Sequence, residues 1–592
     1  MPARILSQPQ PQENIEQLKA QLKAELDECV RANSTGRNHV MDFMLRNGIW
    51  HISNLDYPLR VQFQKWLEQM SLAYATIRKY LLAYDRIKQY SEQQRIRLIA
   101  DGKSIMPAYK NEILFLPHHP DLDIARRFEN AINKEDLVWD FTRNVPESLK
   151  RQVFDILHCA INNDVSFETT RVSLLGLQEL YDFCSEEGIA DIEQMNLYQI
   201  NCFIKKENSR LNQNSRLWAL NFCRKAIFMH SDEIHWNAPV WYMERIHLQP
   251  ERIDNAHPAN QISFLEVTHL KNRDLLQQYA KYGIGLTNLS INCLRHELVY
   301  IKRFLAELNQ SEEENVCMIT PKQMDEYLQK ERYRDVQAET YNKQVMSLLH
   351  FFVFLQVHHH IEQLPFDADY YLMKTQPYHH DRSVSKETAD EILEKLYAFP
   401  ENLRLMFLHL WGVGLRISEV CALKGDSYYI QGQDTWIQIY QTKMRNYKRV
   451  PIPTALFQLM QIYLKKHGIK ADSYVFQGQK GGAYQSITFL KQMQAYCKKL
   501  KIQNGKYKFR CHDYRHTLAT YFYDAGVPLQ SIRDYLGHVY EEMTQQYVDY
   551  MPKRIEKANE EYFSQHRLAV GIEEKEADNT DGEQDMAIGV IR

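Results

Sequence analysis

The sequence CHDYRHTLATYFYDAGVPLQSIRDYLGHVYEEMTQQY spans Cys511–Tyr547 and predicts two helices joined by a turn. His512 and Arg515 are three residues apart at the start of an apolar run, so on a helix their side chains share one face and can approach one anion. A Gly–Val–Pro break then predicts a turn that folds the second helix back, which brings His538 towards the same point. Tyr547 follows nine residues after that histidine and has room to act as a nucleophile. The set suits phosphate chemistry without a metal.

The order and spacing of these residues resemble the tyrosine recombinases, or phage-integrase family, whose second motif has the form H-x-x-R-H…L-G-H…Y. This resemblance requires a further arginine and a lysine upstream. The sequence WGVGLRISEVCAL, at Trp411–Leu423, matches the family's first arginine motif G-L-R-x-S-E and provides Arg416. The chain therefore contains both arginine motifs in the order that the family has them.

A hairpin is predicted by two short β-like runs, Trp436–Tyr440 and Val450–Ile452. The sequence TKMRNYKRVPIP, which starts between them, aligns with the family's lysine-bearing hairpin. The resemblance places Lys443 in the active-site role. The family usually has G-K-G where this chain has T-K-M, so Arg445 and Lys448 remain rivals for that role.

The resemblance implies the following catalytic residues: Arg416, Lys443, His512, Arg515, His538 and Tyr547. Two guanidinium groups would neutralise the phosphate in the transition state, because each donates to two oxygens and stays charged at any working pH. The tyrosine would attack to give a 3′-phosphotyrosine and a free 5′-hydroxyl, with the lysine as general acid. No metal, cofactor or ATP is implied.

Simpler interpretations of these residues remain open. Arg416 can be a structural arginine paired with Glu419, although that pair belongs to the family motif. His538 can be a helix C-cap residue favoured by the helix dipole. Tyr540 and Tyr550 compete for the role of nucleophile; the first lies too close to the preceding histidine, and the second falls on a different helical face.

Charge is distributed unevenly along the 592 residues. The formal net charge is −3, with 25% charged and 44% hydrophobic residues, an ordinary globular composition. From Gln441 to Arg515, however, the sequence has 16 Lys/Arg and 2 Asp/Glu. Such a basic stretch beside a phosphate site predicts contact with the DNA backbone, and the alternative is a solvated basic face. The predicted DNA-binding residues are Lys343, Arg445, Lys448 and Arg449.

Other sequence features restrict the class of protein. No run approaches the roughly 20 apolar residues of a membrane span, and the first residues lack the apolar core of a secretory signal. The ten cysteines are scattered without a C-x-x-C motif, which favours reduced thiols in the cytoplasm. The histidine clusters His358–His360 and His379–His380 lack the matching ligand spacing of a metal site.

The expected fold is mainly α with a small β-hairpin or sheet in the catalytic domain. Similar helical patterns near Thr170–Glu187 and Ser290–Glu307 predict two duplicated four-helix units. The second unit has the position of the family's core-binding domain, a small SAM-like helical bundle. Tyr341 and Lys343 lie on its most apolar helix, at positions that allow them to face a groove of the DNA. The predicted division is an N-terminal arm and helix (1–55), extra helical domains (56–265), a core-binding domain (266–380), a catalytic domain (381–565) and an acidic disordered tail (566–592).

The predicted function is that of a site-specific DNA recombinase, the transposase or integrase of a mobile element. Its size resembles the larger transposases of elements that encode several tyrosine recombinases. The alternatives are a dimer resolvase, a type IB topoisomerase-like enzyme, or a DNA-binding protein with a decayed site. The expected partners are double-stranded DNA, further copies of the chain in a tetramer on paired sites, and other recombinases of the same element.

Overall fold

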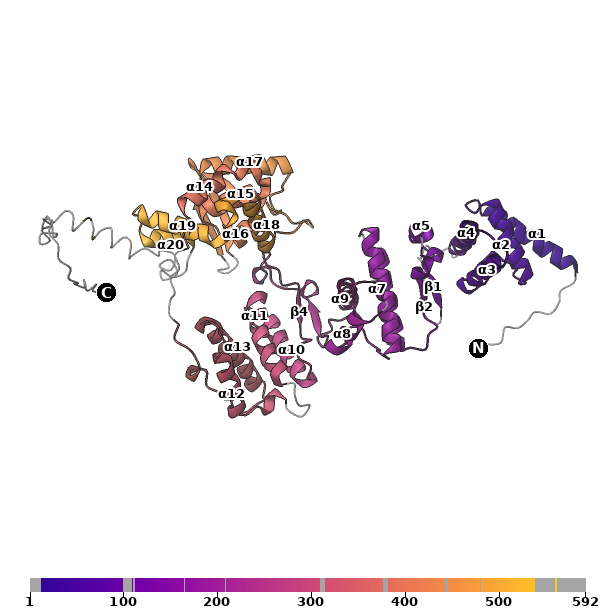
Figure 1. The fold of residues 1–592 in the computed structure, drawn as a ribbon, viewed down its shortest axis with the longest axis horizontal. Coiled ribbons are helices and arrows are strands. Elements are labelled where there is room, and N and C mark those ends of the chain that lie inside the picture. Colours follow the sequence, from indigo (N-terminus) through magenta and orange to yellow (C-terminus); the bar gives the residue numbers. More distant parts are fainter. Residues whose placement is uncertain are drawn as a thin grey trace, which may run out of the picture.

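The computed structural model describes residues 12–98, 109, 112–131, 133–163, 165–207, 209–308, 315–375, 382–441, 446–479, 481–537, 559 and 561. These residues form four helical units with three small antiparallel sheets (Figure 1). The prediction of a mainly helical fold with a small sheet in the C-terminal part is confirmed. None of the helices in the described ranges is long and apolar enough to span a membrane.

The first unit contains helices α1 (Gln12–Glu28), α2 (Ser34–Arg46), α3 (Tyr57–Gln69) and α4 (Tyr74–Leu98). Side chains capping two N-termini fix where helices begin: Asn33 accepts from the Gly36 amide and Asp56 from the Leu59 amide. Buried apolar side chains from Leu22 to Ile87 form one cluster, which includes residues on both sides of position 55.

The second unit contains β1 (Ile113–Phe115), α5 (Leu122–Glu129), β2 (Val138–Asp140), α6 (Glu147–Asn162), α7 (Phe167–Glu186), α8 (Leu197–Lys205) and α9 (Gln213–His230). It is joined to the first unit through Asp85 of α4, a fully buried carboxylate. Arg60 of α3 donates to Asp85 at 2.6 Å, while His118 and Lys134 of the second unit lie 2.9 and 2.5 Å away. The charges of Arg60 and Lys134 and the hydrogen bond with His118 keep the pKa of Asp85 below its usual range, although burial alone would raise it.

The third unit contains β3 (Val240–Tyr242), β4 (Gln261–Ser263), α10 (Leu270–Gly285), α11 (Ile291–Glu307), α12 (Pro321–Arg332) and α13 (Ala338–Val357). Its helices α11 to α13 repeat the long, short, long order of α7 to α9, as the two similar sequence patterns predict. The expectation that Tyr341 faces a groove is wrong. Its side chain is buried (1% exposed), and its hydroxyl donates to the Leu328 carbonyl. Lys343 is exposed.

The fourth unit contains α14 (Lys386–Glu394), α15 (Glu401–Val413), α16 (Ile417–Cys421), β5 (Tyr428–Gln431), β6 (Asp434–Gln441), β7 (Asn446–Pro451), α17 (Thr454–His467), α18 (Ser486–Lys499), α19 (Cys511–Asp524) and α20 (Leu529–Leu536). The predicted hairpin is β6–β7, and the unpredicted strand β5 extends it to three antiparallel strands.

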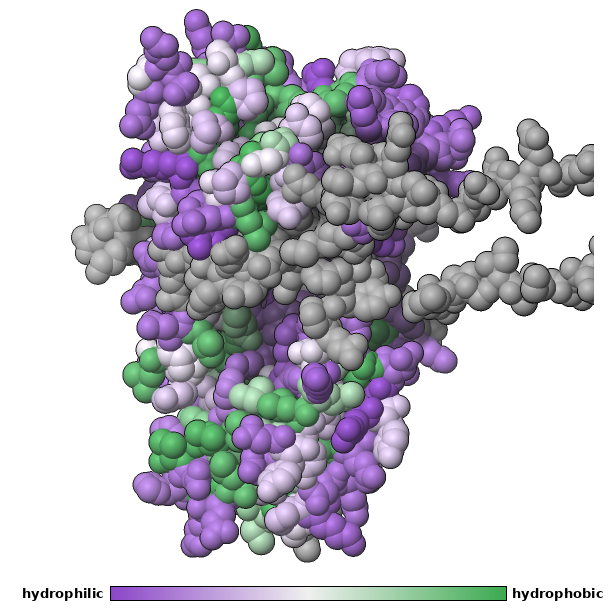
Figure 2. All heavy atoms as spheres, turned by 90° about the vertical axis from the view of Figure 1, so that its left-hand side faces the viewer, coloured by the Kyte–Doolittle hydropathy of each residue, from purple (hydrophilic) through white to green (hydrophobic). Residues whose placement is uncertain are grey.

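Figure 2 shows the side of the molecule that lies at the left in Figure 1. Where its residues are described, this face is mainly hydrophilic, with apolar side chains in small groups.

Two of the three sheets among the described residues lie outside the C-terminal unit, and neither was predicted. Each of them pairs two strands of three residues, β1 with β2 and β3 with β4. A run of three residues is too short to show the alternation of apolar and polar residues by which a strand is recognised. Contacts between distant segments therefore create these strands.

A strap formed by residues 250–260 connects the third and fourth units. Arg252 donates to the carbonyl oxygens of Gly283, Ile284 and Leu289 at 2.5–2.8 Å, which fastens the strap to the end of α10. Ala256 is 1% exposed within the apolar core of the fourth unit, and its carbonyl accepts from the Ser486 amide at 3.1 Å. Figure 1 shows the chain between β3 and β4 reaching towards α18. The two units are thus joined independently of residues 376–381.

The substitution Ala256→Arg should separate these two units, because it places an unpaired charge in an apolar core at a cost of several kcal/mol. A protease site inserted after Tyr378 allows the chain to be cut between them. We expect the two fragments of the otherwise unchanged protein to co-elute in size-exclusion chromatography and those of the Ala256→Arg protein to separate. His257→Arg, at an exposed position in the same strap, is the control and should leave the fragments together. Separation of the unsubstituted fragments would contradict the role of the strap.

Candidate active site

A single buried carboxylate, that of Glu419, lies at the centre of the candidate site. Arg416 Nη1 donates to its Oε1 at 2.9 Å, while Lys448 Nζ and Arg515 Nη1 lie 3.9 and 4.0 Å from its Oε2. Burial alone would raise the pKa of Glu419, but the nearby Lys448, Arg515 and Arg416 lower it to about 2. The carboxylate is therefore ionised. Among the described residues three cations surround this one anion, a positive excess that favours an anionic ligand.

The turn before α16 places Arg416. Helix α15 ends at Gly414, whose φ of +66° suits glycine and where an added Cβ would lie 2.8 Å from Leu518 of α19. Arg416 is then the N-cap residue of α16. Its backbone amide donates to Glu419 Oε2 at 2.9 Å while its guanidinium donates to Oε1. The spacing of the G-L-R-x-S-E motif thus lets one carboxylate accept from both the backbone amide and the guanidinium of Arg416, which orients the arginine.

Arg515 joins the ends of two helices. Its side chain is 1% exposed and donates from Nη1 to the Gly414 carbonyl at 2.8 Å and from Nη2 to the Leu536 carbonyl at 2.5 Å. A cation is favoured at these C-terminal carbonyls by the helix dipoles of α15 and α20. Arg416 and Arg515, predicted from motifs about one hundred residues apart in sequence, therefore approach the same carboxylate.

Lys448 does not occupy a DNA-facing surface, which corrects its assignment as a DNA contact. Alternate residues of β7 point inwards, so Lys448 and Val450 are buried while Arg449 between them is exposed. The Lys448 ammonium donates to the Leu536 carbonyl at 3.3 Å. Every second residue of a strand points to the same face. Lys448 shares this spacing with the apolar Val450 and Ile452, so the sequence already predicts its inward position.

Gln441, the last residue of β6, is a member of the site that sequence analysis missed. Its amide donates from Nε2 to Glu419 Oε1 at 3.0 Å. An added Cβ on Gly537 would lie 2.6 Å from this same amide nitrogen, so the end of α20 packs directly on the end of the hairpin. No motif marks Gln441, since its role depends on contact between segments distant in sequence.

His512 lies in the first turn of α19 at an exposed position. Desolvation by the surrounding protein, assisted by His516, Arg515, Arg416 and Arg382, lowers the pKa of His512 well below its usual range. The imidazole is therefore neutral at working pH, so it can accept a proton or donate a hydrogen bond. Arg382, which was not predicted, belongs to the linker before α14. This linker is anchored on α19, because the Val384 amide donates to Thr517 Oγ1 at 2.8 Å.

Four predicted residues, Lys443, Arg445, His538 and Tyr547, lie outside the described residues. Their roles remain predictions from sequence. The chain segments that lead to them are described: Gln441 and Asn446 flank the first pair, and Gly537 immediately precedes His538. Gln441 and Gly537 pack against each other beside Glu419.

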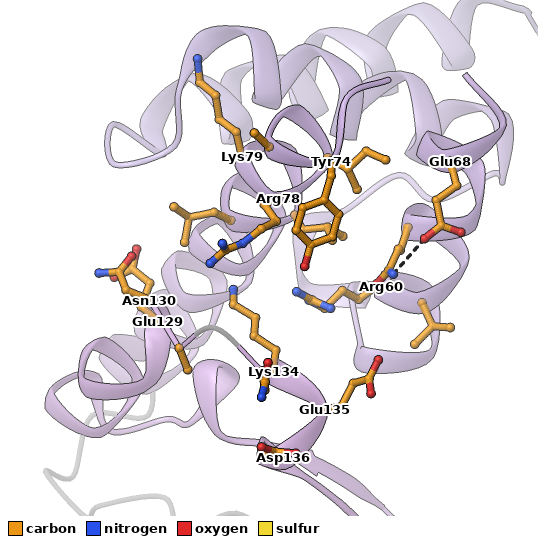
Figure 3. A pocket seen from close by; sticks show the side chains of 18 of the residues that line it. Arg60, Glu68, Tyr74, Arg78, Lys79, Glu129, Asn130, Lys134, Glu135 and Asp136 are labelled. Carbon is orange, nitrogen blue, oxygen red and sulfur yellow. Dashed lines mark hydrogen bonds between the residues drawn. The ribbon is translucent and has the colours of Figure 1, made fainter. Parts of the chain in front are cut away.

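A separate pocket of about 1100 Å³ is lined by residues of the first two units. Helices α3 and α4, which contribute to it, lie far from α16 in Figure 1. Figure 3 shows Arg60, Arg78 and Lys134 directed into it from different elements. Two of these cations already contact Asp85, and several carboxylates line the walls, so the pocket lacks the positive excess found at Glu419. In the ranges that the structure describes, no three His, Cys, Asp or Glu side chains are grouped to hold a metal ion.

Comparison with known proteins agrees with the two arginine motifs. Residues 383–554 match the sequence model of the phage integrase family. This chain carries a phage-integrase domain. The domain begins at the residues that anchor the linker on α19 and includes Arg416, Glu419, Lys448 and Arg515.

Two curated relatives match this chain over stretches longer than the phage-integrase domain. Transposase B from transposon Tn554 of Staphylococcus aureus is 23% identical over 329 residues, which covers 53% of this chain and 51% of the relative. The chain thus matches about half the length of that relative. Tyrosine recombinase XerA of Pyrococcus furiosus is 24% identical over 290 residues, which covers 48% of this chain and 93% of the relative.

Solved structures similar to the chain include the Tn1549 transposon integrase in complex with transposon right end DNA. Its TM-score is 0.37 at 18% identity, covering 50% of this chain and 99% of that one. The XerA recombinase structure has a TM-score of 0.26 at 20% identity, covering 50% and 98%.

Proposed function

We propose that this protein is a site-specific DNA recombinase that cuts and rejoins DNA through a 3′-phosphotyrosine intermediate. The observation that supports it most is the gathering of Arg416, Arg515 and Lys448 around one ionised carboxylate, which leaves a net positive site. A phosphodiester gains negative charge on its non-bridging oxygens during cleavage, and fixed guanidinium groups stabilise that charge. The match to the phage integrase family supports the same chemistry.

In this mechanism each residue has a separate role. Arg416, whose side chain is 16% exposed, donates to the scissile phosphate while Arg515 adds charge from behind. Neutral His512 accepts a proton or a hydrogen bond as the Tyr547 hydroxyl attacks phosphorus. Lys443 donates a proton to the departing 5′ oxygen, with His538 as a further phosphate donor. The phosphotyrosine bond conserves the energy of the phosphodiester, so rejoining proceeds without ATP or a metal.

The substrate and partners follow from the same proposal. We propose double-stranded DNA as substrate, held between the core-binding residues 266–380 and the catalytic residues 381–565, with exposed Lys343 and Arg449 as backbone contacts. The similarity to Transposase B supports the transposase or integrase of a mobile element over a resolvase. Assembly as a tetramer on paired sites, and cooperation with other recombinases of the element, belong to this proposal, as does a cytoplasmic, DNA-associated location.

Covalent capture on a nicked suicide substrate tests the chemistry. Duplexes from the DNA that flanks the coding sequence, each nicked near the candidate cleavage site, would be incubated with the protein in EDTA without ATP. We expect an adduct that survives SDS electrophoresis and carries the label from the 3′-phosphate side. Binding without any adduct would support a decayed DNA-binding protein instead. An adduct that forms solely after metal addition would contradict the metal-independent mechanism.

A further inference from the structure

Lys448 is a charged residue inside the fourth unit whose burial the catalytic scheme leaves unexplained. Its side chain is 5% exposed, and its ammonium lies between the Glu419 carboxylate at 3.9 Å and the Leu536 carbonyl at 3.3 Å. A buried ammonium is costly unless its surroundings compensate it. Retaining a lysine here therefore calls for a specific contribution.

The contacts of Lys448 connect three elements of the site. Strand β7 carries the lysine, α16 carries Glu419, and Leu536 ends α20. The Leu536 carbonyl also accepts from Arg515, so lysine and arginine hold the same helix end. Packing is close there, since an added Cβ on Gly537 would lie 3.0 Å from Lys448 Cδ. A shift of this ammonium would move the helix end that Arg515 contacts.

We propose that Lys448 is a positioning residue of the phosphate site, which fixes the end of α20 against the hairpin and supplies a third positive charge behind the two arginines. It does not touch DNA, because the strand turns it inwards. This inference rests on the proposed recombinase function. It adds a lysine distinct from Lys443, with a role in holding the site rather than in proton transfer to the leaving group.

The charge of Lys448 depends on pH within an accessible range. Burial, with Arg515 and Arg416 nearby, outweighs the attraction of Glu419 and lowers its pKa to about 8, while the amide of Gln441 that faces Glu419 is neutral. The ammonium is thus present below about pH 8 and lost above it. Between that pH and the ordinary pKa of 10.5, the unfolded chain binds the proton and the folded protein does not. This group therefore makes the free energy of unfolding rise with pH, so its deprotonation does not unfold the protein.

The test compares Lys448→Met and Lys448→Arg with the unsubstituted protein. Lys448→Met should lower the single-turnover cleavage rate by about 10–100-fold, by analogy with the loss of a residue that orients a metal ligand, while DNA affinity changes little. Lys448→Arg keeps a permanent charge and should restore most of the rate. The second-order cleavage constant of each protein is measured at subsaturating protein. The ratio of the Lys448→Arg constant to that of the unsubstituted protein should be constant below pH 8 and rise progressively above pH 8.

The matched control is Lys395→Met. Lys395 also donates to a carboxylate and to a helix-end carbonyl, those of Glu391 at 2.6 Å and Leu500 at 3.2 Å, but it is 35% exposed and is the C-cap residue of α14. We expect this variant to cleave at the unsubstituted rate. Parallel pH profiles for Lys448→Arg and the unsubstituted protein would overturn the proposal, and so would full activity of Lys448→Met. Absence of an adduct with the unsubstituted protein would instead refute the recombinase function itself.

Discussion

Tyr547→Phe is expected to abolish the covalent adduct with the suicide substrate and leave DNA binding intact. The phenol oxygen is the atom that would bond to phosphorus, and phenylalanine keeps the ring while removing that oxygen. The measurement is the fraction of labelled DNA retained on the protein in SDS electrophoresis, beside a binding titration in the same buffer. Loss of the adduct should be complete within detection.

Two neighbouring tyrosines provide matched controls for this result. Tyr540→Phe and Tyr550→Phe each remove one phenol oxygen from the same segment of sequence. Both variants should form the adduct as the unsubstituted protein does. An adduct that persists in Tyr547→Phe but disappears in either control would move the nucleophile to that tyrosine. Full strand exchange by Tyr547→Phe would contradict the proposed mechanism.

Replacement of either arginine by methionine should lower single-turnover cleavage by about 10²–10³-fold or more, by analogy with the loss of one oxyanion donor. The two variants should differ in stability. Arg515 is 1% exposed and holds two helix ends, so its loss should cost about 3–5 kcal/mol. Arg416 is 16% exposed and lies at the start of a five-residue helix, so its loss should cost less. Urea unfolding measures this difference.

A double substitution separates catalysis from folding in this comparison. Glu419→Gln added to Arg515→Met removes the buried negative charge that the first substitution leaves undercompensated, and should recover part of the stability. Cleavage should stay low, because the phosphate still lacks a guanidinium. Recovery of cleavage together with stability would show that Arg515 is needed for folding alone. Cleavage by Arg416→Met at the unsubstituted rate would refute the shared phosphate site.

Local sequence patterns predicted most of the fourth unit. Two helices joined by a turn are present as α19 and α20, and the hairpin is present as β6 and β7. Within these elements, apolar residues recur with the period of a helix or of a strand. Such periods involve residues close together in the chain, so they are visible in the sequence. The double hydrogen bond from Arg416 to Glu419 is also local, since the two residues are three positions apart in the sequence. The domain boundaries are less visible, and the apolar cluster that crosses residue 55 shows why: its members pack together across loops.

The sequence by itself determined the chemistry of this protein: which residue types are present, in which order, and on which faces of their helices. The tertiary structure decided which charges meet. It alone places Lys448 and Gln441 beside Glu419, and it alone inserts Ala256 into the core of a unit that begins more than one hundred residues later. The physical reason is that these contacts join segments far apart in the chain, whose approach depends on the packing of every element between them and leaves no periodic pattern at either end.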